Sequence, residues 1–452
     1  MDKKNKFPKV NFIGNKEKLC SWIVDNFPKD CSTIFDAFSG GCSVSYESKK
    51  RGLTVYSNDI LKINSYLSKS IIQNSKIVLN NKDLEKITDG TPVEGFMYKN
   101  YSNKHFFPEE CKELDLYREN IISNFKGYKK YLAFSLLRRS MIRKMPYSRF
   151  NIKWEKVKQL RNEEYSYLKY KRKRAYHNES ISEHLYKNLE NYNNSIFSNG
   201  KKNKSFNLDV FTAIKKIKAD LIYLDPPYCG TMNDYYGFYN LLDEYIVSHK
   251  LGEFKNSFIK KETILGDFKK LFSNLKNFKY WVISYNNRSY PSKDQMLELL
   301  KSFSNKVSIL EKDHNYQITG KIEKKMNKEL LFIVETWMSK EDQNYEDYWK
   351  YTAAITKIES YDEVLLIIIK EIDKGLENSL DYSKVYENIE NKIINLKKFK
   401  GKDPDASARK YVNQFVKLGF IKTGLRSYHK DTETFINTKG DSKRKLLSNI
   451  FW

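Results

Sequence analysis

A run of four apolar residues, Leu221-Ile222-Tyr223-Leu224, ends at an aspartate and two consecutive prolines. Proline has a fixed φ and no backbone N–H, so a buried strand has to end where the prolines begin. Asp225-Pro226-Pro227-Tyr228 is therefore predicted to form a rigid turn at the carboxyl end of a buried strand. Ligands of open α/β sheets bind at that end of the strands. The tetrad is the first candidate site.

A second pattern, through about residue 78, predicts the other half of such a site. Residues 32–35 are predicted to form a short strand that ends at Asp36, and a Gly-rich turn at residues 38–41 follows. Residues 44–50 favour a helix, and residues 53–56 favour another strand, which ends at Asn58-Asp59. Strand, glycine turn, helix, strand and acid is the order that builds a nucleotide-binding parallel sheet.

The sheet is predicted to be interrupted and then resumed. Residues 80–205 are rich in Lys, Arg, Tyr and Asn and favour helices, whereas strand patterns return at residues 219–224, 280–284 and 330–334. We therefore expect a catalytic domain made of residues 1–79 and 206–340, an inserted domain at 80–205 and a separate helical module with a β tail at 346–452.

The chain carries a large surplus of positive charge, with 81 Lys and Arg against 56 Asp and Glu and a formal net charge of +25. Such a surplus attracts polyanions. Nucleic acid is favoured over membrane, because the longest purely apolar run, residues 364–369, is far below the roughly 20 residues that span a bilayer. The five cysteines form no Cys-x-x-Cys pair, and the six histidines are scattered, which predicts a reduced, cytoplasmic protein without a metal site.

The tetrad suits methylation of an aromatic amine. The lone pair of adenine N6 is delocalised into the ring, and two acceptors, the Asp225 carboxylate and the Pro226 carbonyl, could hold both N–H groups and make the nitrogen nucleophilic. Tyr228 would stack on a base that has left the duplex. The alternative is a strand-terminal turn in which Asp and Pro are ordinary turn formers. The buried strand before the tetrad favours the site.

With these motifs the chain resembles, over about its first 340 residues, the Dam-like class of DNA N6-adenine methyltransferases. The resemblance implies a Rossmann-like, mostly parallel methyltransferase sheet with a target-recognition insert, S-adenosylmethionine as cofactor and double-stranded DNA as substrate. Residues 11–16 resemble the family's N-terminal motif, whose lysine, Lys16, lies near the methionine end of the cofactor. Residues 36–41 match an acid-x-Phe-x-Gly motif in which the glycines let the backbone approach the cofactor and Asp36 faces its amino group.

The same resemblance assigns roles to single residues. Asp59 would accept hydrogen bonds from the ribose, Asp209 would contact the cofactor's adenine, and residues 280–288 would line the target-base pocket. Cys42 departs from the motif, which often has glycine there, and we expect only a modest change in the loop. The predicted cofactor-binding residues are Lys16, Asp36, Phe38, Gly40, Asp59, Asp209 and Asp225, and the predicted catalytic residues are Asp225, Pro226, Pro227 and Tyr228.

Two segments are candidates for DNA binding. In the insert, five cations surround Pro146-Tyr147, namely Arg138, Arg139, Arg143, Lys144 and Arg149. For these cations, contact with DNA phosphates is favoured over a merely solvated face. Asp115 and Arg118 are expected to form a helical i,i+3 pair instead of contacting DNA.

The C-terminal module supplies the second segment. A helix is predicted from Asp403-Pro404 to Gly419, with Arg409, Asn413 and Lys417 at i, i+4 and i+8 on one face, as in a recognition helix. Residues 420–426 and 428–436 would form the wing of a winged-helix-like module. The alternative is an amphipathic packing helix with a solvated outer face, and the sequence leaves both open.

The sequence thus predicts a site-specific DNA methyltransferase acting on adenine N6 within a restriction-modification system, with a cognate restriction endonuclease as a candidate partner. One alternative is methylation of cytosine N4 or of adenine in RNA. By the resemblance, Ser or Asn would then commonly replace Asp225. The other is a non-catalytic winged-helix DNA-binding regulator, against which the intact Asp225 and glycine turn argue.

Overall fold

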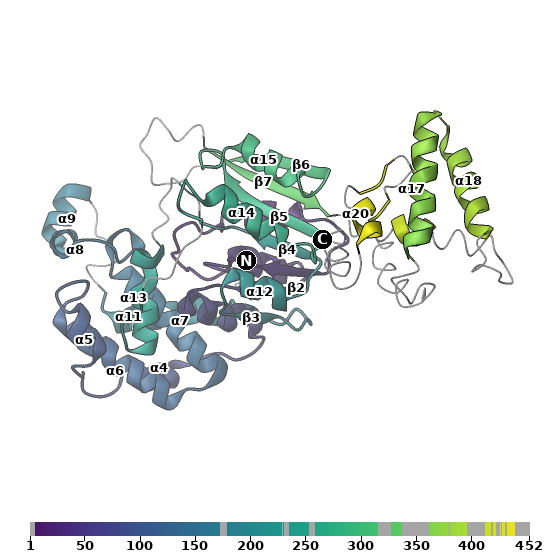
Figure 1. Ribbon diagram of the computed structural model, residues 1–452. Coiled ribbons are helices and arrows are strands. Elements are labelled where there is room, and N and C mark those ends of the chain that lie inside the picture. The colour runs from purple at the N-terminus through teal and green to yellow at the C-terminus, as the bar shows by residue number, and fades with distance from the viewer. Residues whose placement is uncertain are drawn as a thin grey trace. The chain divides into compact units, whose positions relative to one another are not determined.

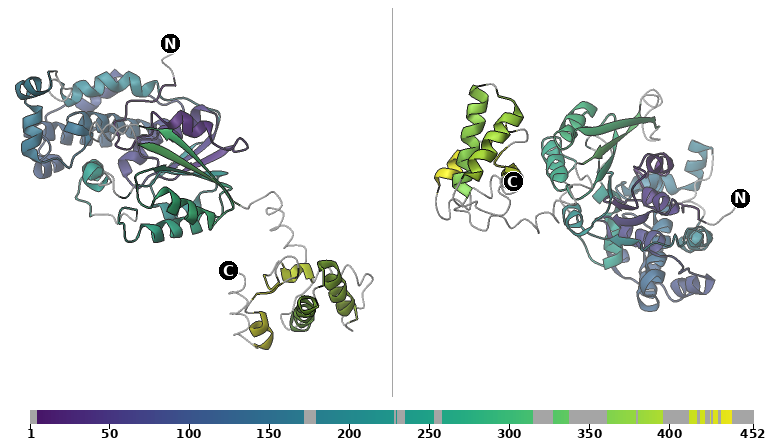
Figure 2. Two further views of the ribbon diagram at one scale, coloured as in Figure 1. Left: turned by 90° about the horizontal axis from the view of Figure 1, so that it is seen from above. Right: turned by 90° about the vertical axis from the view of Figure 1, so that its right-hand side faces the viewer.

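The structure is a computed structural model, and it divides the chain into two compact units, residues 1–337 and residues 338–452. Each unit is described by itself (Figures 1 and 2). The described residues are 5–171, 179–227, 229, 235–252, 258–314, 327–336, 361–378, 380–395, 412–416, 419–421, 425, 427–429 and 432–438.

The first unit is built on one sheet of seven strands in the order β3-β2-β1-β4-β5-β7-β6 (Figure 1). Neighbours from β3 through β5 pair in parallel, and β7 pairs antiparallel with both β5 and β6. The strands are β1 Thr33–Asp36, β2 Thr54–Asn58, β3 Lys204–Phe206, β4 Leu221–Leu224, β5 Tyr280–Asn286, β6 Lys306–Asp313 and β7 Lys328–Glu335. The predicted mostly parallel α/β sheet is confirmed, and the sequence prediction lacked β3 and β6.

Side chains along each strand alternate between two hydrophobic clusters, as the two-residue repeat of a strand requires. On β1, Ile34 belongs to one cluster and Phe35 to the other; on β5, Val282 and Ile283 divide in the same way. Buried side chains of α1 Cys20–Asp25, α2 Ser43–Lys50, α3 Lys62–Ser68 and α13 Tyr235–Val247 join the first cluster, and those of α12 Val210–Lys216, α14 Ile264–Ser273 and α15 Lys293–Lys301 join the second.

Between β2 and β3 the chain is mainly helical. A π-helical turn, Lys69–Gln73, continues α3. All the helices after it except α9 bury apolar side chains in the first cluster, so the insert shares the core of the catalytic sheet. These elements are α4 Asn81–Thr88, α5 Phe96–Tyr101, α6 Pro108–Asn124, α7 Gly127–Arg143, the 3-10 turn Pro146–Ser148, α8 Trp154–Arg161, α9 Glu163–Tyr170 and α11 Ile181–Asn193.

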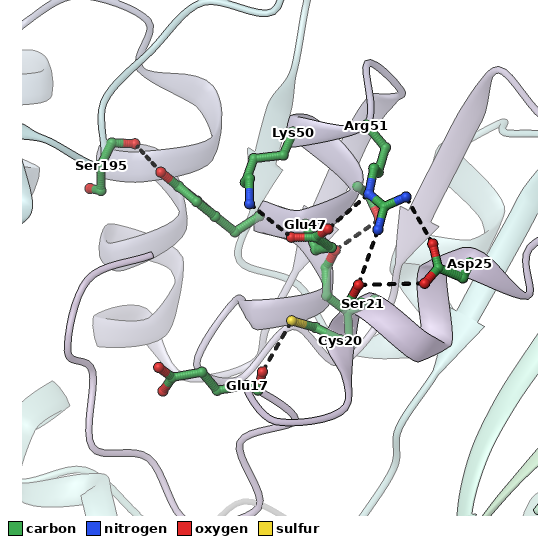
Figure 3. A network of polar contacts seen from close by, with 11 residues as sticks. Glu17, Cys20, Ser21, Asp25, Glu47, Lys50, Arg51 and Ser195 are labelled. Carbon is green, nitrogen blue, oxygen red and sulfur yellow. Dashed lines mark hydrogen bonds and ion pairs between the residues drawn. The ribbon is translucent and has the colours of Figure 1, made fainter. Parts of the chain in front are cut away.

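The helix that follows the glycine turn, α2, is fixed at its far end by a polar network (Figure 3). Arg51, its C-cap residue, donates from Nε to Glu47 (2.9 Å) and from Nη2 to Ser21 (3.0 Å), and its Nη1 lies 2.8 Å from Asp25. Since Ser21 and Asp25 belong to α1, the network ties the C-terminal end of α2 to α1.

The second unit has a hydrophobic core of its own, formed by α17 Tyr361–Glu377, α18 Tyr382–Ile394, a short helix at residues 412–416 and α20 Thr432–Asn437. Ile421 and Tyr428 form one antiparallel bridge. The predicted wing is wrong in its second half, because residues 432–437 are helical. The described residues therefore do not establish a winged helix.

Candidate active site

The carboxyl ends of β1, β2, β4 and β5 lie at one edge of the sheet, and the candidate residues gather there. Asp36 closes β1, Asp59 follows β2, and Asp225 follows β4. Because β7 runs antiparallel to β5, its first residues lie at the same edge, with Glu329 paired opposite Asn286. β1 lies between β2, the next strand along the chain, on one side and β4 on the other. Open α/β sheets bind ligands at such a point, where the strand order reverses.

The glycine turn after β1 is held by Asp59. Gly40 has a φ of +47° and donates its backbone N–H to Asp59 Oδ2 at 2.8 Å, while Leu61 N–H donates to Asp59 Oδ1 at 2.8 Å. A side chain at Gly40 would bring its Cβ within 2.8 Å of Phe12 Cε1. Asp59 thus braces the glycine turn through Oδ2, and the ribose contact predicted for this residue stays a prediction.

Cys42 keeps the conformation that glycine would adopt. Its φ is +65°, its side chain is fully buried, and it caps the start of α2. A non-glycine residue in this region costs roughly 1–2 kcal/mol. The departure from the glycine motif is therefore accommodated by local strain at one residue.

Asp36 is buried, and only one of its oxygens is occupied. Ser45 donates to Oδ2 at 2.6 Å, whereas Asp36 Oδ1, Ser39 Oγ and Asn15 Oδ1 have no hydrogen-bond partner among the described residues. Burial, together with the nearby Asp225 and Asp59 carboxylates, raises the pKa of Asp36 to about 7, and burial raises that of Asp59 to about 6. The turn therefore holds more negative charge and more open acceptors than it can satisfy itself, which suits a cationic ligand.

Two further predicted cofactor residues lie nearer the surface. Phe38 is half-buried and packs edge-on against Phe258 at 5.8 Å between ring centroids. Asp209 is exposed and caps α12 by accepting from Thr212 N at 3.0 Å, which lowers its pKa. The structure thus gives Asp209 a capping role, and its contact with the cofactor remains a prediction.

At the end of β4, Asp225 forms an ion pair with the N-terminal segment. Lys16 Nζ lies 3.0 Å from Asp225 Oδ1 and 3.5 Å from Glu329 Oε1. Lys16 is 4% exposed and Glu329 is fully buried, whereas Asp225 keeps 16% of its side chain exposed. Pro226 is buried and Pro227 half-buried; Tyr228 lies outside the described residues. The structure therefore brings Lys16 and Asp225 together across 209 positions of sequence and adds Glu329, which no sequence pattern indicated.

The helix after the tetrad, α13, contacts both halves of the site. Its Tyr239 hydroxyl accepts from Ile13 N at 2.9 Å, and its ring stacks on Phe12 at 4.8 Å. Its Asp243 accepts from Lys62 N (2.7 Å) and Ile63 N (2.8 Å) at the start of α3. Sequence reasoning missed both residues, although an acid within the apolar run 235–247 was an available signal.

Three of the five cations predicted to contact phosphate are buried. Arg138 is 1% exposed and donates to Val10 O at 2.8 Å, Arg139 is 5% exposed, and Lys144 is 5% exposed and lies 3.2 Å from Glu110. A phosphate contact requires an exposed head group, so the structure contradicts that role for these three side chains in the conformation described. Arg138 also faces the Phe12 ring at 5.9 Å, which makes it a support of the N-terminal segment.

The other two cations remain accessible. Arg143 and Arg149 are half-buried, and Arg149 lies over the rings of Tyr147 (6.0 Å) and Phe238 (5.6 Å). Tyr147 is 61% exposed. Arg149 and an exposed aromatic ring thus lie beside Phe238 of α13.

The expected Asp115–Arg118 pair is not formed. Asp115 accepts from Met97 N (2.8 Å) and Tyr98 N (2.9 Å), and Arg118 Nε donates to Tyr245 O (2.8 Å). Asp115 and Arg118 are therefore each hydrogen-bonded to backbone groups of a neighbouring helix instead of to each other.

In the second unit, the described part of the predicted recognition helix is short. Asn413 is exposed on the helix 412–416, and Arg409 and Lys417 lie outside the described residues.

Among the described residues, no three His, Cys, Asp or Glu side chains gather as metal ligands, and no helix is both long and apolar enough to cross a membrane.

Comparison with known proteins agrees with this geometry. Residues 12–318 match the family model of the D12 class N6 adenine-specific DNA methyltransferases. The Type II methyltransferase M2.HphI of Haemophilus parahaemolyticus is 52% identical over 330 residues, which cover 73% of this chain and 98% of that protein. The Type II methyltransferase M.FokI of Planomicrobium okeanokoites is 26% identical over 284 residues, or 56% of this chain and 40% of that protein. Modification methylase StsI of Streptococcus sanguinis is 32% identical over 121 residues, or 24% of this chain and 18% of that protein. With a family match over most of its length, and with Asp225 and the glycine turn at one sheet edge, the chain belongs to the D12 class of N6 adenine-specific DNA methyltransferases.

Proposed function

We propose that this enzyme uses S-adenosylmethionine as methyl donor at the glycine turn and that Asp225 and Pro226 hold the amine of a flipped-out adenine in duplex DNA. The observation that carries the proposal is the juxtaposition of an unsatisfied acidic turn, around Asp36, with the Lys16–Asp225 ion pair.

The residues of the turn fit the donor's charges. The α-ammonium and sulfonium groups are cationic, and the open acceptors Asp36 Oδ1, Ser39 Oγ and Asn15 Oδ1 are buried where such a group would be desolvated. When bound, S-adenosylmethionine supplies a methyl carbon whose bond to sulfur breaks, with the electron pair left on sulfur, as adenine N6 bonds to that carbon. Gly40 would let the backbone approach the donor, because its position is free of a side chain and braced by Asp59.

The tetrad would act on the base. The Asp225 carboxylate and the Pro226 carbonyl each accept one N6–H, which draws the nitrogen lone pair out of conjugation and stabilises the positive charge that develops there. The proton that N6 releases passes to Asp225 or to water. Lys16 holds Asp225 Oδ1 at 3.0 Å and would so fix the orientation of the carboxylate toward the amine.

Duplex DNA would lie against the insert beside α13, with Arg143 and Arg149 near phosphates and Tyr147 against a base or sugar. The exposure of Tyr147 supports this placement, as does the position of Arg149 between Tyr147 and Phe238. A role within a restriction-modification system, with a cognate endonuclease as partner, is supported by the similarity to Type II methyltransferases.

The decisive experiment compares the wild type with Asp225→Ala. Duplex DNA is incubated with each protein and S-adenosylmethionine, and modified adenines are located by direct sequencing, while calorimetry measures binding of the cofactor. We expect Asp225→Ala to abolish methylation and to keep cofactor affinity within about threefold, a small energy by affinity arithmetic. Methylation of adenine by Asp225→Ala would contradict the assigned role, and absence of cofactor binding by the wild type would contradict the donor.

A further inference from the structure

The helix α9 has apolar side chains that do not serve the core. It contributes no side chain to the two hydrophobic clusters of the first unit, and its one buried residue is Ser166. Tyr167 is 54% exposed and its neighbour Leu168 is 62% exposed. Large apolar side chains that are exposed next to each other indicate an interaction surface more often than scattered ones do.

The start of α9 is firmly attached to the rest of the insert. Arg161, at the end of α8, donates from Nη1 to Glu110 of α6 at 2.8 Å, and its guanidinium lies 4.7 Å from the centre of the Phe107 ring. Asn162 then caps α9 by accepting from Tyr165 N at 2.8 Å. The exposed side chains of α9 are therefore presented from a fixed base.

Positive charge collects at the other end of α9. Lys169 Nζ lies 5.6 Å and 5.8 Å from the ring centres of Tyr165 and Tyr170 and donates to the Tyr165 hydroxyl at 3.2 Å. The hydrogen bond to Tyr165 and the nearby phenols of Tyr170 and Tyr147 raise the pKa of Lys169, so this side chain keeps its charge. In the sequence, five of the six residues 169–174 are Lys or Arg. Such a run repels a second copy of itself and attracts a polyanion.

α9 is also continuous with the surface proposed above for DNA. α8 packs against α9 and against the 3-10 turn that carries Tyr147, and Figure 1 shows α8 and α9 together at one end of the first unit. Leu168, Tyr147 and Tyr167 are the three most exposed large apolar side chains in the described part of this unit. The acids of α9, Glu163 and Glu164, lie in its first turn, at the end away from the basic run.

We propose that α9 is a DNA-reading element of this enzyme, in which Tyr167 and Leu168 contact base edges outside the target adenine and Lys169 contacts a neighbouring phosphate. The inference rests on the proposed function, in which duplex DNA lies against Tyr147 and Arg149. A helix fits the major groove, where each base pair presents a distinct pattern and thymine offers a methyl group for apolar contact. The phosphate contact would fix the register of α9, and the base contacts would select the sequence.

The test uses the full-length enzyme and duplexes that carry the recognition site found by sequencing modified adenines. Each base pair of that site other than the target is changed in turn, and an unrelated duplex is included. The variants are Tyr167→Ala, Leu168→Ala and Lys169→Ala. For each protein, DNA affinity and its salt dependence, single-turnover methylation, affinity for S-adenosylmethionine and the melting temperature are measured.

Three exposed positions elsewhere in the insert provide matched controls. Tyr186→Ala removes a ring that is 41% exposed on α11, and Ile122→Ala shortens a side chain that is 39% exposed on α6. Lys112→Ala removes a cation that also lies over a tyrosine ring, that of Tyr98 at 5.0 Å, but whose charge is paired with Glu94 at 2.9 Å.

We expect Tyr167→Ala and Leu168→Ala to lose about 5- to 50-fold of the discrimination against a change at one or two base pairs, and to bind unrelated DNA within about threefold of the wild type. Lys169→Ala should weaken binding to every duplex and reduce the slope of log affinity against log salt concentration by about 1. Because all three side chains lie outside the core, melting temperatures should stay within about 2 °C and cofactor affinity within about threefold. The controls should match the wild type.

Wild-type discrimination by both Tyr167→Ala and Leu168→Ala would overturn base reading by α9. An equal loss of affinity for the recognition site and for unrelated DNA would overturn it as well, and an unchanged salt slope for Lys169→Ala would refute the phosphate contact. Failure of the proposed function looks different, because the wild type would then methylate no adenine in duplex DNA or Arg149→Ala would leave DNA binding unchanged. Expected results for Arg149→Ala together with unaltered α9 variants refute only the inference about α9.

Discussion

Replacing Gly40 by alanine tests whether the glycine turn is built for close approach. The new Cβ would lie 2.8 Å from Phe12 Cε1, where carbon atoms normally stay at about 3.5–4.0 Å. The Phe12 ring cannot simply turn aside, because it stacks on Tyr239 at 4.8 Å and has Arg138 at 5.9 Å. Overpacking of this kind costs about 1–3 kcal/mol. The left-handed conformation at a φ of +47° adds roughly 1–2 kcal/mol.

Gly52 provides the matched control. It also has a positive φ, +85°, but a Cβ there would have no neighbour within 4 Å. Gly52→Ala should therefore show only the conformational cost. Gly40→Ala should be less stable than Gly52→Ala by about 1–3 kcal/mol, which corresponds to a melting temperature lower by about 2–6 °C.

The functional consequence is measured by calorimetry with S-adenosylmethionine. Gly40→Ala moves the turn away from Asp59, so cofactor affinity should fall about 10-fold or more, which is the effect of about 1.4 kcal/mol. Gly52→Ala should bind like the wild type, and Phe12→Leu should restore part of the stability lost in Gly40→Ala by making room for the methyl group. Equal melting temperatures and equal affinities for the two alanine variants would refute the reasoning.

Three other outcomes are expected. Because the pKa of Asp36 is raised to about 7, its carboxyl is partly protonated near neutral pH and a cationic ligand favours the ionised form. Cofactor affinity should therefore rise with pH through about 7 with release of a proton, measured by calorimetry in two buffers, and a flat affinity between about pH 6 and 8 would contradict this. The pKa of Asp243 is also raised to about 7 by burial, so its stabilising contribution is complete below the unfolded value of 3.8 and is lost as pH rises through 7. Asp243→Asn should flatten the fall in melting temperature between about pH 5 and 8, and an unchanged pH dependence would argue against it. Finally, Arg149→Ala should weaken DNA binding and reduce by about 1 the slope of log affinity against log salt concentration. Arg138→Met should lower the melting temperature and leave that slope unchanged. A smaller slope for Arg138→Met and an unchanged slope for Arg149→Ala would place the DNA elsewhere.

The strands that position the site could be predicted from the sequence, because the residues before Asp36, Asp59 and Asp225 form short apolar runs that stop at acids. The edge strands could not. β3 has only three residues, and most side chains of β6 are exposed or half-buried, so neither shows the pattern of a buried strand.

Side-chain partners were harder to predict than strands. The burial of Arg138 and Arg139 depends on how α7 is rotated against the N-terminal segment, and a dense basic tract alone does not reveal which cations face inward. The Lys16–Asp225 contact was implied by family resemblance only as common proximity to the cofactor. Glu329 became visible only through strand direction, since an antiparallel β7 is what brings its first residues to the carboxyl edge.

That edge also explains how a methyltransferase can contain a long insertion without losing its chemistry. The insert leaves the sheet after β2 and returns at β3, which lie on the outer side of β1. The reacting groups depend instead on β1, β4, β5 and β7, which are consecutive neighbours in the sheet and are paired without interruption. Asp59 ties the end of β2 to the glycine turn, Asp243 of α13 holds the start of α3, and Arg138 of the insert donates to Val10 in the N-terminal segment. If the insert reads DNA, we infer that its surface can vary while these two carboxylates keep the cofactor turn and the helix after the tetrad in register.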